Sequence, residues 1–211
     1  MLALIDYGSG NVRSVFKALE HVGAEVAFVS NREELAKADA VVLPGVGAFE
    51  DCVANLHQRG LWEPLAEWLE QGKPFLGICV GYQLLFETSE EAPPTTRGFG
   101  FFKGSVRRFS TPGLKVPQIG WNALTLDQPD HPLWAGLPEN PHVFFVHSFF
   151  APPLASGETT ASSVYGEPFA ASAARGAVAG VQFHPEKSQN VGLAILRNFV
   201  NTLAPSGSGT K

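Results

Sequence analysis

Hydrophobic and polar positions follow two different periods in about the first 90 residues of the chain. Short apolar runs of strand length cover residues 2–6, 25–29, 40–43 and 74–76. Between them, apolar positions recur at the spacing of an amphipathic helix, over residues 12–22, 51–59 and 61–71. Because strands and helices alternate, the pattern predicts a parallel sheet with right-handed crossovers.

Cap and turn residues mark the ends of the first elements. Residues 8–10 are typical of a turn, Asn11 then caps the first helix, and Gly23 ends it. Ser30 followed by Glu33 is a capping-box signature and predicts a short helix. The turn lacks the third glycine of a dinucleotide-binding fingerprint, so it does not predict a cofactor site.

The residue pattern changes after Thr88, where proline, glycine and aromatic residues separate short strand-like segments. These pieces cover residues 99–102, 143–149 and 177–183. We expect them to extend the sheet in antiparallel fashion. The predicted fold is therefore α/β, with an open, mostly parallel central sheet flanked by helices and an antiparallel extension.

A helical pattern over residues 191–203 and a Gly/Ser-rich tail over residues 204–211 complete the chain. The tail is predicted to be disordered, because its composition cannot bury apolar surface. No repeat or linker divides the rest, so residues 1–203 are predicted to form a single domain. A chain of 211 residues is long enough for one α/β domain.

Composition narrows the class of protein. Hydrophobic residues make up 45% and charged residues 17%, and the formal net charge of -5 does not favour nucleic acid as a partner. No apolar stretch approaches the roughly 20 residues of a membrane helix, and the N-terminus lacks the basic start of a signal peptide. We therefore expect a cytoplasmic protein in which Cys52 and Cys79 remain thiols.

The segment Gly-Ile-Cys-Val-Gly at residues 77–81 carries the most specific chemical signal. It joins an apolar strand-like run to a helix-like run at residues 82–86, which is the arrangement of a nucleophile elbow with a thiol. Small residues on both sides allow the sharp turn. Cys79 is therefore the candidate nucleophile, at a helix N-terminus whose dipole favours an anion.

A second signal lies far downstream, where His184 and Glu186 are two positions apart in an extended segment and can point to one side. His184 would act as base and proton shuttle, and Glu186 would fix its tautomer. With Cys79 they form a candidate triad. The acid follows the histidine in the chain, unlike the order in α/β-hydrolases.

An oxyanion hole needs two donors near the nucleophile. The N–H of Val80 is one candidate, and the loop at residues 44–49 follows a strand, so an amide of Val46 or Gly47 is the second. The ordinary alternatives stay open: a packed small residue for Cys79 and a plain strand-to-helix turn for the loop.

Other polar residues fit structural roles better. Cys52 lies on a helix face with apolar neighbours, which predicts a core position. His147 lies within an aromatic run, where a satisfied, partly buried histidine is the ordinary case. No spacing of histidine, cysteine or acidic residues suggests a metal site.

These motifs resemble class I (triad-type) glutamine amidotransferases, which hydrolyse glutamine to glutamate and ammonia. Within that class, the segments at residues 44–49, 77–85, 115–122, 145–148 and 182–188 resemble the glutaminase subunits of imidazole glycerol phosphate synthases, which serve histidine biosynthesis. The segments span nearly the whole chain, and their joint occurrence is more specific than any one of them.

The resemblance implies a Cys79 thioester, with His184 as the proton donor and no cofactor or metal. It also implies that Gln83, Ser148 and Phe149 bind glutamine, the last two partly through backbone groups. The family often has tyrosine where this chain has Phe149, so one possible hydrogen bond is absent.

The resemblance further implies a heterodimer with a (β/α)₈-barrel cyclase subunit that receives ammonia through a channel. Trp121, Asn122 and Lys187 match segments near that interface. Subunits of this kind are typically poor catalysts alone, and partner and ligand are thought to reorganise the loop near Gly47.

Two alternatives are weighed against this assignment. One is a glutaminase serving another synthase, such as the one for pyridoxal phosphate, which the segments at residues 44–49 and 115–122 disfavour. The other is a non-catalytic regulatory or scaffolding relative, which an intact Cys79, His184 and Glu186 disfavour.

Overall fold

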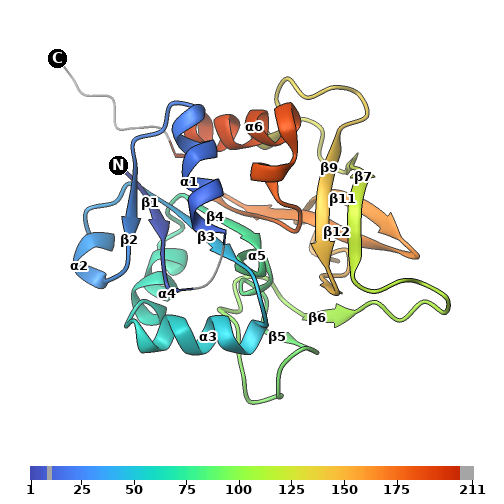
Figure 1. Ribbon diagram of the computed structural model, residues 1–211, viewed down its shortest axis with the longest axis horizontal. Coiled ribbons are helices and arrows are strands. Elements are labelled where there is room, and N and C mark those ends of the chain that lie inside the picture. Colours follow the sequence, from blue (N-terminus) through green and yellow to red (C-terminus); the bar gives the residue numbers. More distant parts are fainter. Residues whose placement is uncertain (9–10, 205–211) are drawn as a thin grey trace.

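The apolar runs of the first part of the chain become neighbouring parallel strands of the main sheet (Figure 1). The computed structural model describes residues 1–8 and 11–204. The central strands β1 (Leu2–Ile5), β3 (Ala40–Gly45) and β4 (Phe75–Cys79) are buried at every position. Strands covered on both faces need continuous rather than alternating apolar sequence, which is why these runs were recognisable.

Within the described residues, the main sheet has eight strands in the order β2-β1-β3-β4-β13-β12-β11-β8. Pairing is parallel from β2 to β13 and antiparallel from β13 to β8. The predicted α/β sheet with an antiparallel extension is therefore confirmed. The strands not yet given are β2 (Val26–Val29), β8 (Thr125–Leu126), β11 (Thr159–Tyr165), β12 (Glu167–Arg175) and β13 (Val178–Val181).

Two smaller sheets flank the antiparallel side. One joins β10 (Phe149–Phe150), β6 (Ser105–Arg108) and β5 (Thr88–Ser89), and the other pairs β7 (Gln118–Ala123) with β9 (His142–His147). The strand predicted over residues 143–149 is thus broken at Ser148, and its two parts belong to different sheets.

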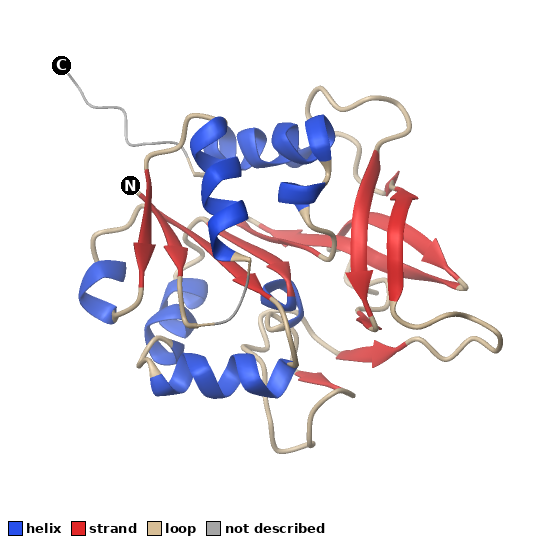
Figure 2. Ribbon diagram, viewed as in Figure 1, coloured by secondary structure: helices blue, strands red, loops and turns tan. Residues whose placement is uncertain are grey.

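Helices cover both faces of the main sheet (Figure 2). Figure 1 shows α1 (Val12–His21) and α6 (Gln189–Asn198) on one face, and α3 (Phe49–Gln58) and α4 (Trp62–Glu70) on the other. Every helix within the described residues falls short of the length and apolarity needed to cross a bilayer. The shorter helices are α2 (Arg32–Leu35), α5 (Val80–Gln83), the 3₁₀-helices η1 (Pro132–Trp134) and η2 (Pro185–Lys187), and the π-helix η3 (Phe199–Leu203).

The capping box predicted from Ser30 and Glu33 was one residue early. The N-cap of α2 is Asn31, whose Oδ1 accepts the N–H of Glu34 at 2.9 Å. The Glu34 carboxylate in turn accepts the N–H of Ser30 at 2.9 Å. Asn11 does stand at the N-cap of α1, but its side chain makes no capping bond.

Residues 99–102 do not form the predicted strand. The N–H of Phe99 donates to the carbonyl of Leu84 at 2.7 Å, and that of Phe102 donates to Leu85 at 2.9 Å. Gly100 between them has a φ of 67°, outside the range of a strand. The aromatic run therefore closes the C-terminal end of α5, because that one-turn helix leaves carbonyls without intrahelical partners.

Two predicted segments lie partly outside the described residues. Residues 9 and 10 of the predicted turn, and residues 205–211 of the predicted tail, lie outside the described residues. The helix predicted over residues 191–203 begins earlier, at Gln189, and continues as η3.

Glycines allow β3, β4 and α5 to approach one another closely. A Cβ atom on Gly77 would lie 2.6 Å from the Gly81 carbonyl oxygen, and one on Gly45 would lie 2.7 Å from the Gly81 nitrogen. A Cβ atom on Gly81 would overlap the carbonyl of Leu43 on β3. Backbone therefore packs directly on backbone around the turn after β4.

We predict that Gly81→Ala lowers the free energy of unfolding by about 3 kcal/mol or more, because backbone atoms cannot make room for the added methyl group. Urea denaturation measures the loss. The matched control is Gly60→Ala, where φ is 64° and nothing lies within 4 Å of the added atom. That variant should lose only about 1 kcal/mol through left-handed backbone strain. Equal losses would contradict the close-packed turn.

Candidate active site

Cys79 lies at the turn between β4 and α5 and has a φ of 55° and a ψ of -111°. A positive φ costs a residue with a side chain about 1–3 kcal/mol and is typical of functional turns. The parallel register places Cys79 opposite Gly45, at the carboxyl edge of the sheet. A strand, a sharp turn and a helix follow one another around Cys79, as the sequence pattern predicts, but α5 covers Val80–Gln83 rather than residues 82–86.

His184 and Glu186 follow β13, the strand that pairs with β4 on the other side. The N–H of His184 donates to the carbonyl of Phe144 at 2.9 Å, which fixes the backbone of the segment. Its Nδ1 lies 2.9 Å from Glu186 Oε1, and both side chains are buried. Because a carboxylate only accepts, Nδ1 carries a proton. The buried Nε2 makes no hydrogen bond among the described residues, so it is the ring atom left for the sulfur.

Two neighbours of the His184 ring favour its charged form. Burial alone disfavours the imidazolium, but the nearby Cys79 sulfur and the Glu186 carboxylate outweigh it and raise the pKa of His184 to about 10. The ring is therefore an imidazolium at neutral pH. The thiolate is the nucleophilic form of cysteine, and a cationic imidazole beside the sulfur is how thiol nucleophiles are activated.

Two buried side-chain amides, those of Gln83 and Gln182, form a hydrogen-bonded chain that ends near the Cys79 sulfur. Gln83 Nε2 donates to the carbonyl of Phe149 at 2.9 Å and to Gln182 Oε1 at 3.1 Å. Gln182 Nε2 lies 3.9 Å from Cys79 Sγ. Sequence patterns did not single out Gln182. The extended segment predicted around His184 and Glu186 is wrong, because Pro185–Lys187 form the 3₁₀-helix η2; its turn still brings Glu186 to the His184 ring.

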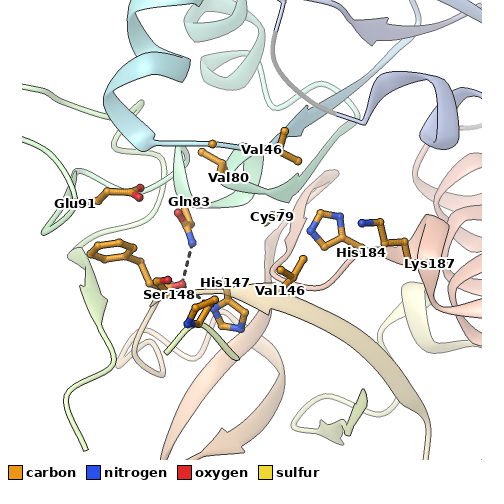
Figure 3. A pocket seen from close by; sticks show the side chains of 13 residues that line it. Val46, Cys79, Val80, Gln83, Glu91, Val146, His147, Ser148, His184 and Lys187 are labelled. Carbon is orange, nitrogen blue, oxygen red and sulfur yellow. Dashed lines mark hydrogen bonds between the residues drawn. The ribbon is translucent and has the colours of Figure 1, made fainter. Parts of the chain in front are cut away.

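A cavity of about 370 Å³ opens above Cys79. Figure 3 shows His184 and Lys187 on one side of it and Gln83 and Glu91 on the other. The candidate residues that line it are Val46, Gly47, Cys79, Val80, Gln83, Ser148, Phe149, His184 and Lys187. The lining residues that sequence patterns missed as ligands are Glu91, Pro117, Val146 and His147.

Glu91 supplies a carboxylate on the wall of the cavity. The N–H of Phe49 donates to its Oε2 at 2.9 Å. Partial burial, helped by the nearby charge of Asp51, nevertheless raises the pKa of Glu91. A cationic ligand group would stabilise this carboxylate. Among the described residues, no group of three or more histidine, cysteine or acidic side chains could hold a metal ion.

The candidate oxyanion donors come from two segments of the chain that line the cavity, the start of α5 and the loop after β3. The N–H of Val80 is the first amide of α5, so it has no intrahelical partner. Gly47, with a φ of 94°, and Val46 line the cavity from the loop after β3. Cys52 is buried on α3 as expected for a core residue, and its thiol lies 3.7 Å from the carbonyl oxygen of Val46.

The three candidate interface residues have different surroundings. Trp121 is 45% exposed on β7. Asn122 donates through Nδ2 to the carbonyl of Val164 at 3.0 Å, so its amide is engaged within the chain. Lys187 lines the cavity, with Nζ 5.9 Å from the ring centre of Phe144.

Sequence comparison places the chain among well-defined relatives. The family model described as Glutamine amidotransferase class-I matches residues 3–203. A protein of Microcystis aeruginosa named imidazole glycerol phosphate synthase subunit HisH is 50% identical over 202 residues, which are 95% of this chain and 94% of that protein. A protein of the same name from Trichormus variabilis is 48% identical over 203 residues, 95% of each chain.

Solved structures share the fold at low sequence identity. One described as the crystal structure of glutamine amidotransferase has a TM-score of 0.75 and 21% identity, and covers 97% of this chain and 99% of that one. The structure of PurLQS from Thermotoga maritima has a TM-score of 0.72 and 20% identity, with coverage of 95% and 97%.

We predict that Glu186→Gln lowers the pKa of His184, because it removes the carboxylate that favours the imidazolium. Ring resonances of His184 followed by NMR should titrate near pH 10 in the wild type and at least about one unit lower in the variant. A raised pKa stabilises the fold fully below the unfolded value of about 6.5 and less as pH rises through the folded value. The difference in the free energy of unfolding between the two proteins should therefore shrink towards high pH. A His184 titration midpoint that is the same in both proteins would contradict the role given to Glu186.

Proposed function

The chain belongs to the class-I glutamine amidotransferases, and from this premise we propose that it is the glutaminase subunit of an imidazole glycerol phosphate synthase. Relatives about half identical over nearly their whole length carry that name. The observation that carries the proposal is that the buried Cys79 and His184 line a cavity large enough for an amino acid, while the buried Glu186 carboxylate lies on Nδ1 of the ring. The reaction is hydrolysis of glutamine to glutamate and ammonia.

The first chemical step uses Cys79 and His184. The thiolate attacks the side-chain amide carbon of glutamine, and the carbonyl oxygen becomes an oxyanion. His184 then gives its Nε2 proton to the amide nitrogen, the carbon–nitrogen bond breaks, and ammonia leaves. The product on the enzyme is a γ-glutamyl thioester on Cys79.

The second step returns the enzyme to its starting state. His184, now neutral, takes a proton from water as the water attacks the thioester. The carbon–sulfur bond breaks, glutamate leaves, and the thiolate and imidazolium are restored. Glu186 stays ionised and holds Nδ1–H in both steps, so the ring does not change its tautomer or orientation.

We assign the stabilisation of the oxyanion to hydrogen bonds from backbone amides. The N–H of Val80 is one donor, and an N–H of Val46 or Gly47 is the second. One missing donor costs roughly 3 kcal/mol of transition-state stabilisation. A loop that supplies the second donor only in the complete synthase would therefore keep the free subunit slow.

The cavity walls suit the two ends of glutamine. The Glu91 carboxylate matches the α-ammonium group, and Gln83 lies on the same side of the cavity (Figure 3). The backbone of Ser148 and Phe149, which also line the cavity, supplies further polar contacts. Glutamine binding should then lower the pKa of Glu91, which burial raises in the free protein.

The partner proposed for this subunit is a (β/α)₈-barrel cyclase. It would take the ammonia and form imidazole glycerol phosphate and an aminoimidazole carboxamide ribonucleotide. An apolar strip on β7 supports a docking surface beside the cavity: Ile119 is 64% exposed and Trp121 45%. Ile119 pairs with cavity-lining Val146, and Trp121 pairs with Phe144, whose ring lies under Lys187. A reducing cytoplasm, which we also propose, keeps the required thiol free.

We predict that Cys79→Ala abolishes glutamine-dependent product formation by the complete synthase, by at least about 10³-fold. Ammonia supplied as an ammonium salt should restore cyclase turnover in the same complex, because the partner's chemistry does not need the thiol. Product formation is followed with each nitrogen source in parallel. Glutamine-dependent turnover that survives the substitution would refute the proposed nucleophile.

We predict that Ile119→Asp weakens binding of the cyclase subunit at least about 10-fold, because it places a charge in an apolar contact. Calorimetric titration of the two subunits measures the dissociation constant. The matched control is Phe28→Asp, since Phe28 is 44% exposed but lies on β2, the edge strand at the other end of the main sheet. If both variants weaken binding alike, the strip on β7 is not the docking surface.

A further inference from the structure

We propose that His147 is a positioning residue for the glutaminase reaction: it holds the Phe149 carbonyl that orients Gln83 and, through it, Gln182. The inference rests on the proposed function, since it assigns a role within that site. His147 is the last residue of β9 and lines the cavity. It therefore stands where the chain turns from one small sheet to another at Ser148.

Two donors meet at one carbonyl oxygen. His147 Nδ1 lies 2.7 Å from the oxygen of Phe149, and Gln83 Nε2 lies 2.9 Å from the same oxygen. A backbone carbonyl has two lone pairs and no proton, so both nitrogens must donate. Two hydrogen bonds therefore hold the turn at Ser148, one from His147 on β9 and one from Gln83 on α5.

This acceptor sets the direction of the whole amide chain. Because the Phe149 oxygen can only accept, the nitrogen of the Gln83 amide must face it, and the Gln83 oxygen is left for a ligand. Gln83 also donates to Gln182 Oε1, so Gln182 turns its nitrogen towards the Cys79 sulfur. The Phe149 carbonyl therefore determines which way both amides face, up to the Cys79 sulfur.

Burial makes His147 suited to this role and unsuited to proton transfer. The side chain is 6% exposed. Burial lowers the pKa of His147 to about 4, against the opposing effect of the Phe149 carbonyl and with help from the nearby charge of His184. The ring is neutral at physiological pH, in the tautomer that carries its proton on Nδ1.

Packing fixes the ring in place. Gln118 stands opposite His147 in the pairing of β7 with β9, and its amide atoms, like His147 Nε2, make no hydrogen bond among the described residues. Unpaired buried polar atoms cost free energy where they lie, so this pair does not hold the ring; the surrounding aromatic side chains do. Aromatic rings with centres 5.3 to 5.5 Å from the imidazole enclose it, from Phe109, Phe145 and Phe169.

Two substitutions separate the two ring nitrogens. In His147→Asn the side-chain nitrogen can take the place of Nδ1, and in His147→Gln it can take only the place of Nε2. Steady-state glutaminase kinetics are measured in the complete synthase with the cyclase subunit and its nucleotide ligand. In His147→Gln we expect the KM for the substrate glutamine to rise at least about 10-fold, which corresponds to the loss of one buried hydrogen bond. In His147→Asn the KM should stay within about 3-fold of the wild-type value. The kcat should change little in either variant.

Turnover with ammonium salt in place of glutamine reports folding and assembly of each variant. Equal KM values in both variants, or a wild-type KM in His147→Gln, would overturn the role of His147. If the wild-type complex does not hydrolyse glutamine at all, the proposed function fails instead. Should His147→Gln not fold, ¹⁵N NMR of the wild-type ring decides: the inference requires the proton on Nδ1, and a proton on Nε2 alone refutes it.

Discussion

The close approach of backbone to backbone at the end of β4 is the constraint on which the site depends. Gly45, Gly77 and Gly81 have no side chains to separate β3, β4 and α5. The chain can therefore reverse direction within one residue, and Cys79 takes a positive φ there. Without that turn the sulfur would continue along the strand into the core, and no neighbouring group could serve it.

The order of strands then brings the second half of the site to the first. Parallel strands end at one edge of a sheet, and β13 lies beside β4, so His184 emerges next to Cys79 although over a hundred residues separate them. Glu186 on one side and the Gln83 and Gln182 amides on the other hold the ring and the sulfur. Burial strengthens each of these polar contacts, because little water competes for them.

Local patterns in the sequence were enough for the parallel sheet and for the sharp turn at Cys79, because the apolar runs and the glycines are visible without tertiary contacts. They were also enough to propose His184 and Glu186 as partners of Cys79, which the structure brings together. They failed for residues 99–102, where an aromatic run of strand character instead closes the end of α5. They also missed Gln182, whose role appears only when β13 and α5 lie together. Helix ends, strand breaks and amide networks depend on partners distant in the chain, and this is why such features could not be predicted.

The most direct test of the account is to map where a glutamine analogue with an electrophilic diazoketone in place of its amide becomes attached. The protein is incubated with the analogue, digested, and its peptides are weighed by mass spectrometry. We expect one label, on Cys79, blocked by excess glutamine, with the buried Cys52 unlabelled as an internal control. Labelling of Cys52 instead, or hydrolysis of glutamine by fully labelled protein, would contradict the claim that the sulfur at the turn forms the covalent intermediate.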